Sequence, residues 1–142
     1  MNKLGVIVGR FQPLHKGHVS LILKALEENE KVLILVGSVN RERNFNNPYS
    51  MPRRLTMIRN VFPEKTYDNL YVRGLKDKHS DDEWIGELTA NINQLEEDPT
   101  QVILYTSEKD SEWYSQATLY AVAAVDSNGI SATNIRQSMY YS

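Results

Sequence analysis

A chain of 142 residues with a formal net charge of −2 is long enough for one domain with its own hydrophobic core. The near-neutral charge argues against general binding to nucleic acid, and the absence of cysteine excludes a disulfide framework and a thiolate zinc site. No apolar run approaches the length of a membrane span, and the first three residues lead directly into a strand pattern rather than a signal peptide. We therefore expect a single soluble, cytoplasmic domain over residues 1–142.

The first predicted elements are an apolar strand over residues 4–8 and a helix over residues 19–26, joined by the stretch GRFQPLHKGH. A strand that is apolar throughout is typical of the centre of a parallel sheet. Gly9 lets a ligand approach the backbone, and the free N–H groups of a helix start attract anions. His15 and His18 lie on one face of the first helical turn, where both can donate to the same group. The stretch predicts a polyphosphate site, although a lone histidine or glycine in such a place is more often a surface or turn residue.

A second buried strand over residues 32–37 completes a strand–helix–strand unit. Residues 38–51 then form a polar stretch without periodicity that contains two arginines and four asparagines. Loops of this length are uncommon in compact domains and are often functional. The stretch is either a surface excursion or, because it follows a parallel strand, a lid over a ligand.

Pro52 begins a helix that ends near residue 61, and residues 70–75 form a third strand whose alternating pattern places it near a sheet edge. A further helix starts after Ser80. The acidic residues of its first turn suit the positive end of a helix, so they need no functional role. Trp84 in that turn is either part of the core or a flat ring on which a ligand cation stacks.

A fourth strand is predicted over residues 101–106, and a fifth strand, or a short strand with a turn, over residues 117–125. Lys109 follows the fourth strand, where it either lies in an ordinary turn or meets a phosphate as a point charge. Five strands alternating with helices predict an α/β, doubly wound, Rossmann-like parallel five-stranded sheet with helices on both faces. In such a sheet the ligand crevice lies at the carboxyl ends of the strands.

The segment ISATNIR near the end of the chain can form a second phosphate site. Ser131 is a natural N-cap, and Thr133 and Arg136 fall on the first turn after it. Considered alone, the segment is a capped helix with a surface arginine. Together with the histidine stretch, it predicts a second helix start that binds phosphate, with a guanidinium for bidentate contact.

These two stretches, in this order, resemble the signatures of the HxGH nucleotidyltransferase superfamily. Within it, residues 9–13 are similar to those of the nicotinamide mononucleotide (NMN) adenylyltransferases of the archaeal type and of the bacterial proteins that fuse this enzyme to a Nudix hydrolase. The resemblance implies the nucleotidyltransferase fold. It also implies direct in-line transfer of the adenylyl group of ATP to NMN, giving NAD and pyrophosphate without a covalent intermediate.

The resemblance further implies roles for individual residues. It implies that the catalytic residues are His15, His18 and Arg136. It implies that ATP and its phosphates are bound by Gly9, Arg10, Phe11, Gln12, Gly17, Lys109, Ser131 and Thr133. It implies that NMN is bound by Asn47, Arg54, Asp77 and Trp84. The family carries a glycine and an acidic residue where this chain has Pro52 and Arg53. The implied cofactor is Mg²⁺, held by substrate phosphates and water rather than by protein side chains.

Two alternatives to this function stay open. One is adenylyl or cytidylyl transfer to another phosphorylated acceptor, and the other is a non-catalytic module that senses NAD or NMN. The chain contains no Nudix box and ends at Ser142, six residues after Arg136. We expect either a short enzyme or one part of a longer protein with a hydrolase domain. ATP and NMN are the expected partners, with no nucleic acid and no membrane; a homo-oligomer is compatible with the resemblance.

Overall fold

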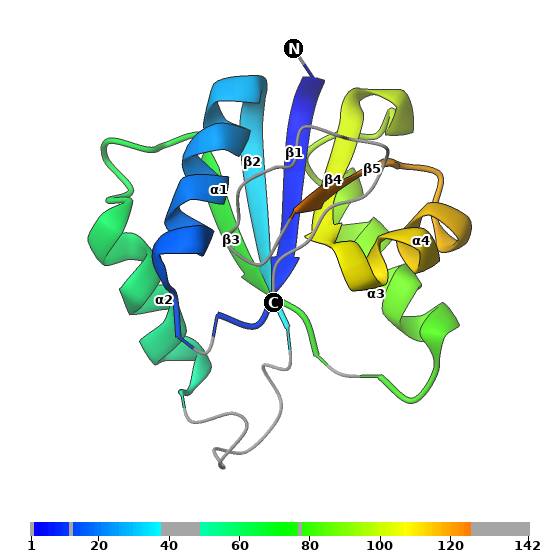
Figure 1. The fold of residues 1–142 in the computed structure, drawn as a ribbon, viewed down its shortest axis with the longest axis horizontal. Coiled ribbons are helices and arrows are strands. Elements are labelled where there is room, and N and C mark those ends of the chain that lie inside the picture. Colours follow the sequence, from blue (N-terminus) through cyan, green and yellow to red (C-terminus); the bar gives the residue numbers. More distant parts are fainter. Residues whose placement is uncertain (1, 12, 38–48, 77, 126–142) are drawn as a thin grey trace.

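Five parallel strands form one sheet in the computed structural model, which describes residues 2–11, 13–37, 49–76 and 78–125 (Figure 1). Their order across the sheet is β3-β2-β1-β4-β5, and every neighbouring pair is parallel. The strands are β1 (Asn2–Gly9), β2 (Asn29–Val36), β3 (Leu70–Gly74), β4 (Val102–Ser107) and β5 (Ala121–Val125). The predicted doubly wound α/β sheet is confirmed, with β1 at its centre and β3 at one edge.

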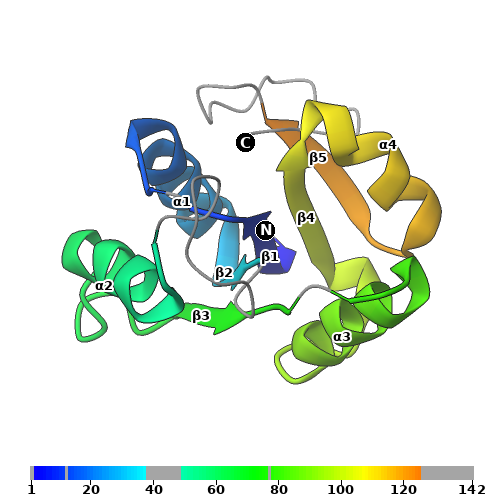
Figure 2. The ribbon, with the colours of Figure 1, turned by 90° about the horizontal axis from the view of Figure 1, so that it is seen from below.

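Helices cover both faces of this sheet. Within the described residues they are α1 (Lys16–Glu28), α2 (Met51–Val61), α3 (Asp81–Asn93) and α4 (Glu108–Ala117), with a 3-10 turn at Pro99–Gln101. Helices α1 and α2 lie on one face, and α3 and α4 lie on the other (Figure 2). In the part of the chain that the structure describes, no helix combines the length and the apolarity needed to span a membrane.

The strands supply the core of both faces because their side chains alternate between them. In β2, Ile34 belongs to the cluster that contains Leu21 of α1, whereas Leu35 belongs to the cluster that contains Leu88 of α3. All four of these side chains are 0% exposed. A strand buried on both faces reads as a continuous apolar run, which is why β1 and β2 could be predicted from the sequence.

Helix α4 begins where the sequence analysis allowed an ordinary turn around Lys109, and β5 begins at Ala121 rather than at residue 117. Ser107 caps the helix, since its Oγ accepts a hydrogen bond from the N–H of Asp110 at 3.1 Å. The buried residues of α4 are Ser111 and Tyr114, both of which carry a hydroxyl. The inward face therefore gives no apolar periodicity, and the prediction missed the helix.

A polar cluster inside the core joins the end of α1 to β2 and β4. Asn29 is 1% exposed, and its Nδ2 donates to the Ala25 carbonyl at 2.8 Å and to the Tyr105 hydroxyl at 3.0 Å. The Tyr105 hydroxyl in turn donates to Oε1 of Glu28 at 2.7 Å, and burial raises the pKa of Tyr105. Gly5 leaves room for this cluster, because a Cβ at that position would lie 2.5 Å from Nδ2 of Asn29.

Candidate functional site

The loop between β1 and α1 runs along the carboxyl edge of the sheet (Figure 1), and Figure 2 looks onto that edge. Gly9 is the last residue of β1, and its carbonyl accepts a hydrogen bond from the N–H of Gly37 at 2.8 Å. The backbone turns at Phe11, where φ is 52°, and α1 then begins at Lys16. The histidine stretch therefore lies at the edge where doubly wound sheets bind their ligands.

The two histidines of this stretch form the N-terminal cap of α1. His15 is the N-cap residue, and its Nδ1 accepts a hydrogen bond from the N–H of Gly17 at 3.0 Å. Nδ1 of His18 accepts from the N–H of His15 at 3.1 Å, which completes a capping box. The rings are stacked, with centroids 3.7 Å apart and planes inclined by 25°. Because Nδ1 is the acceptor in both rings, each neutral imidazole carries its hydrogen on Nε2 and is a donor there.

Phe11 packs against His18 from the side of the core. Phe11 and His18 are each 1% exposed, and their ring centroids are 4.6 Å apart. A positive φ costs a non-glycine residue about 1–3 kcal/mol, and burial of the aromatic ring helps to offset that cost at Phe11. The contact with ATP that the resemblance implies for Phe11 stays a prediction, whereas its contact with His18 is a feature of the fold.

Arg54 in the first turns of α2 is 2% exposed and reaches the same loop. Its Nη1 donates to the carbonyl of Arg10 at 3.0 Å and to that of Gly37 at 2.8 Å. Its Nε donates to the carbonyl of Ser50 at 3.4 Å. Burial, and to a lesser extent the charge of Arg10, lowers the pKa of Arg54. The family resemblance placed Arg54 among the NMN-binding residues, and the sequence gave no sign that it would be buried.

Two further predicted residues lie in first helical turns on the other face of the sheet. Lys109 is exposed in α4, directly after β4, the strand that neighbours β1. Trp84 in α3 is half-buried, and its ring lies 6.1 Å from that of Trp113 and 5.7 Å from that of Tyr114. The structure thus packs Trp84 of α3 against α4 and leaves part of its side chain exposed.

Gly17 is buried in the first turn of α1, and Arg10 is exposed in the loop. The remaining predicted site residues lie outside the described residues: Gln12, Asn47, Asp77, Ser131, Thr133 and Arg136. Their roles stay predictions. Ser107 and Ser111, which the sequence analysis did not single out, are buried at the junction of β4 and α4. The signal that could have found Ser107 is its position three residues before Asp110, a capping pattern.

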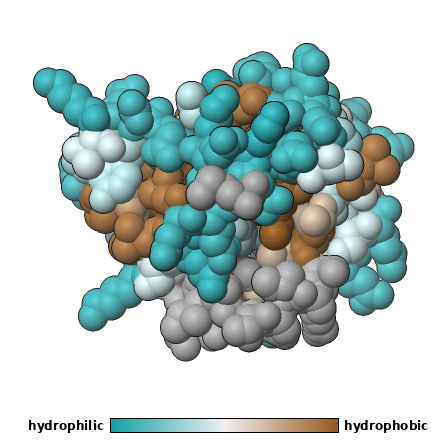
Figure 3. Space-filling view, turned by 90° about the horizontal axis from the view of Figure 1, so that it is seen from above, coloured by the Kyte–Doolittle hydropathy of each residue, from teal (hydrophilic) through white to brown (hydrophobic). Residues whose placement is uncertain are grey.

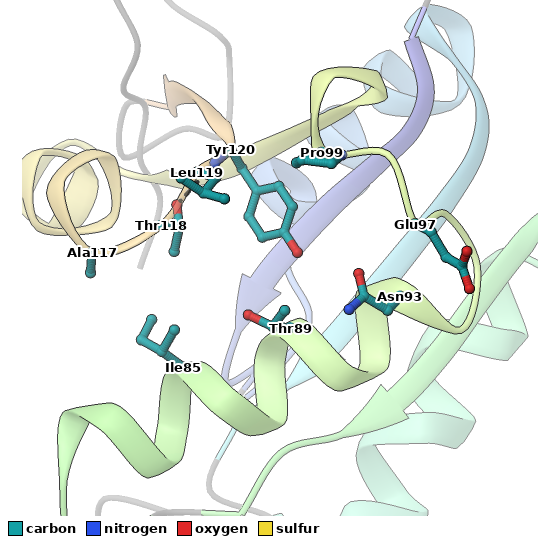
Figure 4. Close-up of a pocket in the computed structure, with 9 residues that line it drawn as sticks. All are labelled: Ile85, Thr89, Asn93, Glu97, Pro99, Ala117, Thr118, Leu119 and Tyr120. Carbon is teal, nitrogen blue, oxygen red and sulfur yellow. Dashed lines mark hydrogen bonds between the residues drawn. The ribbon is translucent and has the colours of Figure 1, made fainter.

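A groove of about 410 Å³ lies between α3 and the connection from α4 to β5 (Figure 4). Tyr120 points across it toward Thr89 and Asn93 of α3. Pro99 and Leu119, which also line it, precede β4 and β5, so the groove belongs to the amino edge of the sheet. Figure 3 views the molecule from that edge, where hydrophilic residues separate smaller hydrophobic patches. Among the predicted ligand-site residues that the structure describes, none lines this groove.

Comparisons with known proteins identify the family and the fold. A family model described as Cytidylyltransferase-like matches residues 6–138. The chain is 29% identical over 140 residues to the nicotinamide/nicotinic acid mononucleotide adenylyltransferase of Acinetobacter baylyi, covering 95% of this chain and 74% of that protein. It is 30% identical over 88 residues to the nicotinamide-nucleotide adenylyltransferase of Thermoplasma acidophilum, covering 62% of this chain and 49% of that protein.

Among solved structures, the chain is similar to a bifunctional NMN adenylyltransferase/ADP ribose pyrophosphatase from Francisella tularensis. The TM-score is 0.76 at 29% identity, over 82% of this chain and 35% of that one. A second structure of the Francisella tularensis protein, in complex with AMP and a manganese ion, gives a TM-score of 0.74 at 29% identity. The match covers 82% of this chain and 34% of that one. This chain thus spans about a third of the Francisella protein and about half of the Thermoplasma one.

Proposed function

Because this chain belongs to the Cytidylyltransferase-like family, the HxGH nucleotidyltransferases, we propose that it transfers the adenylyl group of ATP to NMN, giving NAD and pyrophosphate. The observation that carries this proposal is the histidine capping box at the carboxyl edge of the sheet. It presents the Nε2 atoms of two stacked imidazoles as donors beside the start of a helix, which is a favourable place for a polyphosphate. The names of the relatives support NMN as the acceptor.

In this reaction a phosphate oxygen of NMN attacks the α-phosphorus of ATP. A new P–O bond forms as the bond to the β-phosphate breaks, and the electron pair leaves with pyrophosphate. The nucleophile and the leaving group both belong to the substrates, so the protein contributes position and charge neutralisation. We assign Nε2–H of His18 to the α-phosphate, where negative charge develops, and His15 to the remainder of the triphosphate.

The other assignments follow the family resemblance. Arg10, Lys109 and the segment with Ser131, Thr133 and Arg136 are assigned to the phosphates of ATP, with Arg136 placed on the leaving pyrophosphate. Asn47, Asp77 and Trp84 are assigned to NMN, where the partly accessible ring of Trp84 offers a face for the nicotinamide cation.

The metal ion enters the reaction as part of the substrate, MgATP. The described residues contain no group of three His, Cys, Asp or Glu side chains that could hold an ion. Mg²⁺ commonly binds through substrate phosphates and water, which suits such a site. The Francisella structure in complex with AMP and a manganese ion supports the use of a divalent cation, and Mg²⁺ in that role is our proposal.

An assay with ATP and Mg²⁺ tests the function directly. The chain is incubated with NMN, and NAD and pyrophosphate are measured separately; equal amounts of both are expected. The name of the Acinetobacter relative favours nicotinic acid mononucleotide as a second acceptor, so it is tested in parallel, and CTP is tested as an alternative donor. Binding of NMN or NAD in a calorimeter with no product formed would instead favour a sensing module. The cytoplasmic location and any oligomer stay predictions.

A further inference from the structure

Arg54 holds together two segments that are far apart in the sequence. The Arg10 carbonyl is 44 positions from it and the Gly37 carbonyl is 17 positions from it, and both accept from the single nitrogen Nη1. The N–H of Gly37 also donates to Gly9 at 2.8 Å. The end of β2 and the start of the histidine loop are therefore joined twice, once through the backbone and once through a side chain of α2.

Burying the positive charge of Arg54 in this position costs free energy. The hydrogen bonds that the structure describes for its side chain all go to backbone carbonyls, so within the described residues no carboxylate neutralises it. Burying a charge without an ionic partner is unfavourable, and an apolar side chain of similar volume would fill the space without that cost. Packing alone therefore does not explain a guanidinium here. A planar guanidinium does explain it, because Nη1 donates to the Arg10 and Gly37 carbonyls while Nε donates to that of Ser50.

The carbonyl of Arg10 belongs to the peptide that enters Phe11. Its orientation sets φ of Phe11, which is 52° and lies in the left-handed region. That angle in turn places the Phe11 ring, whose centroid lies 4.6 Å from the His18 ring. Since a non-glycine residue leaves the left-handed region when it is not restrained, release of the Arg10 carbonyl would let Phe11 move and the His18 imidazole with it.

The geometry points to Arg54 as a positioning residue: by holding the Arg10 and Gly37 carbonyls, it keeps Phe11 turned inward and the His18 imidazole in place. This differs from the contact with NMN that the family resemblance implies for Arg54, because here it acts on the histidine rather than on the acceptor. Its kinetic consequence rests on the proposed function, whereas its effect on the His18 ring does not.

Three variants of the whole chain test this role. Arg54→Met keeps the volume and removes the charge and the donors, whereas Arg54→Lys keeps the charge and one donor nitrogen but loses Nε and the planar group that fixes its direction. Arg59→Met is the matched control. Arg59 is in the same helix and donates to the Leu70 carbonyl at 2.8 Å and the Phe62 carbonyl at 3.4 Å, at the end of α2 away from the histidines. All three are compared with the wild type by urea unfolding.

Two readouts separate positioning from a general loss of stability. The first is kcat and KM for ATP and NMN. Both Arg54 variants should lose about tenfold to a hundredfold in kcat with each KM changed less than about threefold, because small displacements of a catalytic group have effects of this size. The second is the long-range ¹H–¹⁵N NMR spectrum of the histidine rings. His18 should lose its single Nε2–H tautomer in the Arg54 variants and keep it in Arg59→Met.

Several outcomes would overturn the inference. A normal kcat in either Arg54 variant would show that the guanidinium is not needed to position His18, and a rise confined to the KM for NMN would restore the direct contact with the acceptor. An equal loss of kcat in Arg59→Met would show that the loss comes from general destabilisation rather than from the positioning of His18. If the wild type forms no NAD, the proposed function fails, but the His18 spectrum still decides the role of Arg54. If Arg54→Met does not fold, Arg54→Lys supplies both readouts.

Discussion

Replacing His18 with asparagine should separate the two roles that the structure gives this residue. The side chain of His18 accepts from the N–H of His15 at 3.1 Å through Nδ1, and Nε2–H is its remaining donor. In His18→Asn, Oδ1 comes close to the position of Nδ1 and can keep the capping bond, but no donor remains at the position of Nε2. In His18→Ala both are lost.

The expected magnitudes follow from these contacts. Loss of a capping bond costs about 1 kcal/mol, and loss of the ring contacts with Phe11 and His15 adds about 1 kcal/mol or more. We therefore expect His18→Ala to lower the free energy of unfolding by about 2–3 kcal/mol. Because His18→Asn keeps the capping bond, its loss of stability should be about 1 kcal/mol smaller than that of His18→Ala. A donor aimed at developing negative charge contributes about 10²–10³ in kcat, so both variants should lose that factor with little change in KM.

Urea unfolding followed by circular dichroism and steady-state assays of NAD formation measure the two effects on the same preparations. Equal losses of kcat with unequal losses of stability are expected. Near-normal turnover in His18→Asn would refute the role of Nε2–H. Equal stability of the two variants would refute the capping contribution of His18.

Gly5→Ala should lower the free energy of unfolding in urea by about 2 kcal/mol or more, because its Cβ would lie 2.5 Å from Nδ2 of Asn29. Gly86→Ala in α3 is the matched control: its Cβ would have no neighbour within 4 Å, so a gain of about 0.5–1 kcal/mol is expected. Burial raises the pKa of Tyr105, so this tyrosine ionises at a lower pH in the unfolded chain than in the folded one. The contribution of the protonated Tyr105 to the free energy of unfolding is therefore complete below about pH 10 and is lost as the pH rises further. Tyr105→Phe should flatten the decline of unfolding free energy above pH 10 by up to about 1.4 kcal/mol per pH unit, and an unchanged slope would contradict this. Trp84→Ala should raise the KM for NMN by about tenfold, the size of a cation–π contact, and a matching rise in the KM for ATP would count against that role.

The sequence alone determined the strand runs and the position of the histidine stretch. Val6 and Leu33 lie in runs that are apolar throughout, and such runs predict central parallel strands without any knowledge of the fold. His15 and His18 are three positions apart at the end of such a run, so their common face on a first turn follows from helix geometry. The apolar runs and the spacing of the two histidines are local signals that extend over a few residues, so the sequence shows them directly.

The tertiary structure alone decided what surrounds the histidines. Arg54 is buried where it donates to the carbonyls of Arg10 and Gly37, which are 44 and 17 positions away in the chain. No residue pattern near Arg54 indicates these partners. The left-handed turn at Phe11 runs against the local preference of an aromatic residue and depends on burial beneath His18. Helix α4 was hidden for a related reason, since it turns the hydroxyl-bearing Ser111 and Tyr114 inward. Periodicity and capping are local, whereas burial and hydrogen bonding join residues distant along the chain, so only the folded chain could show them.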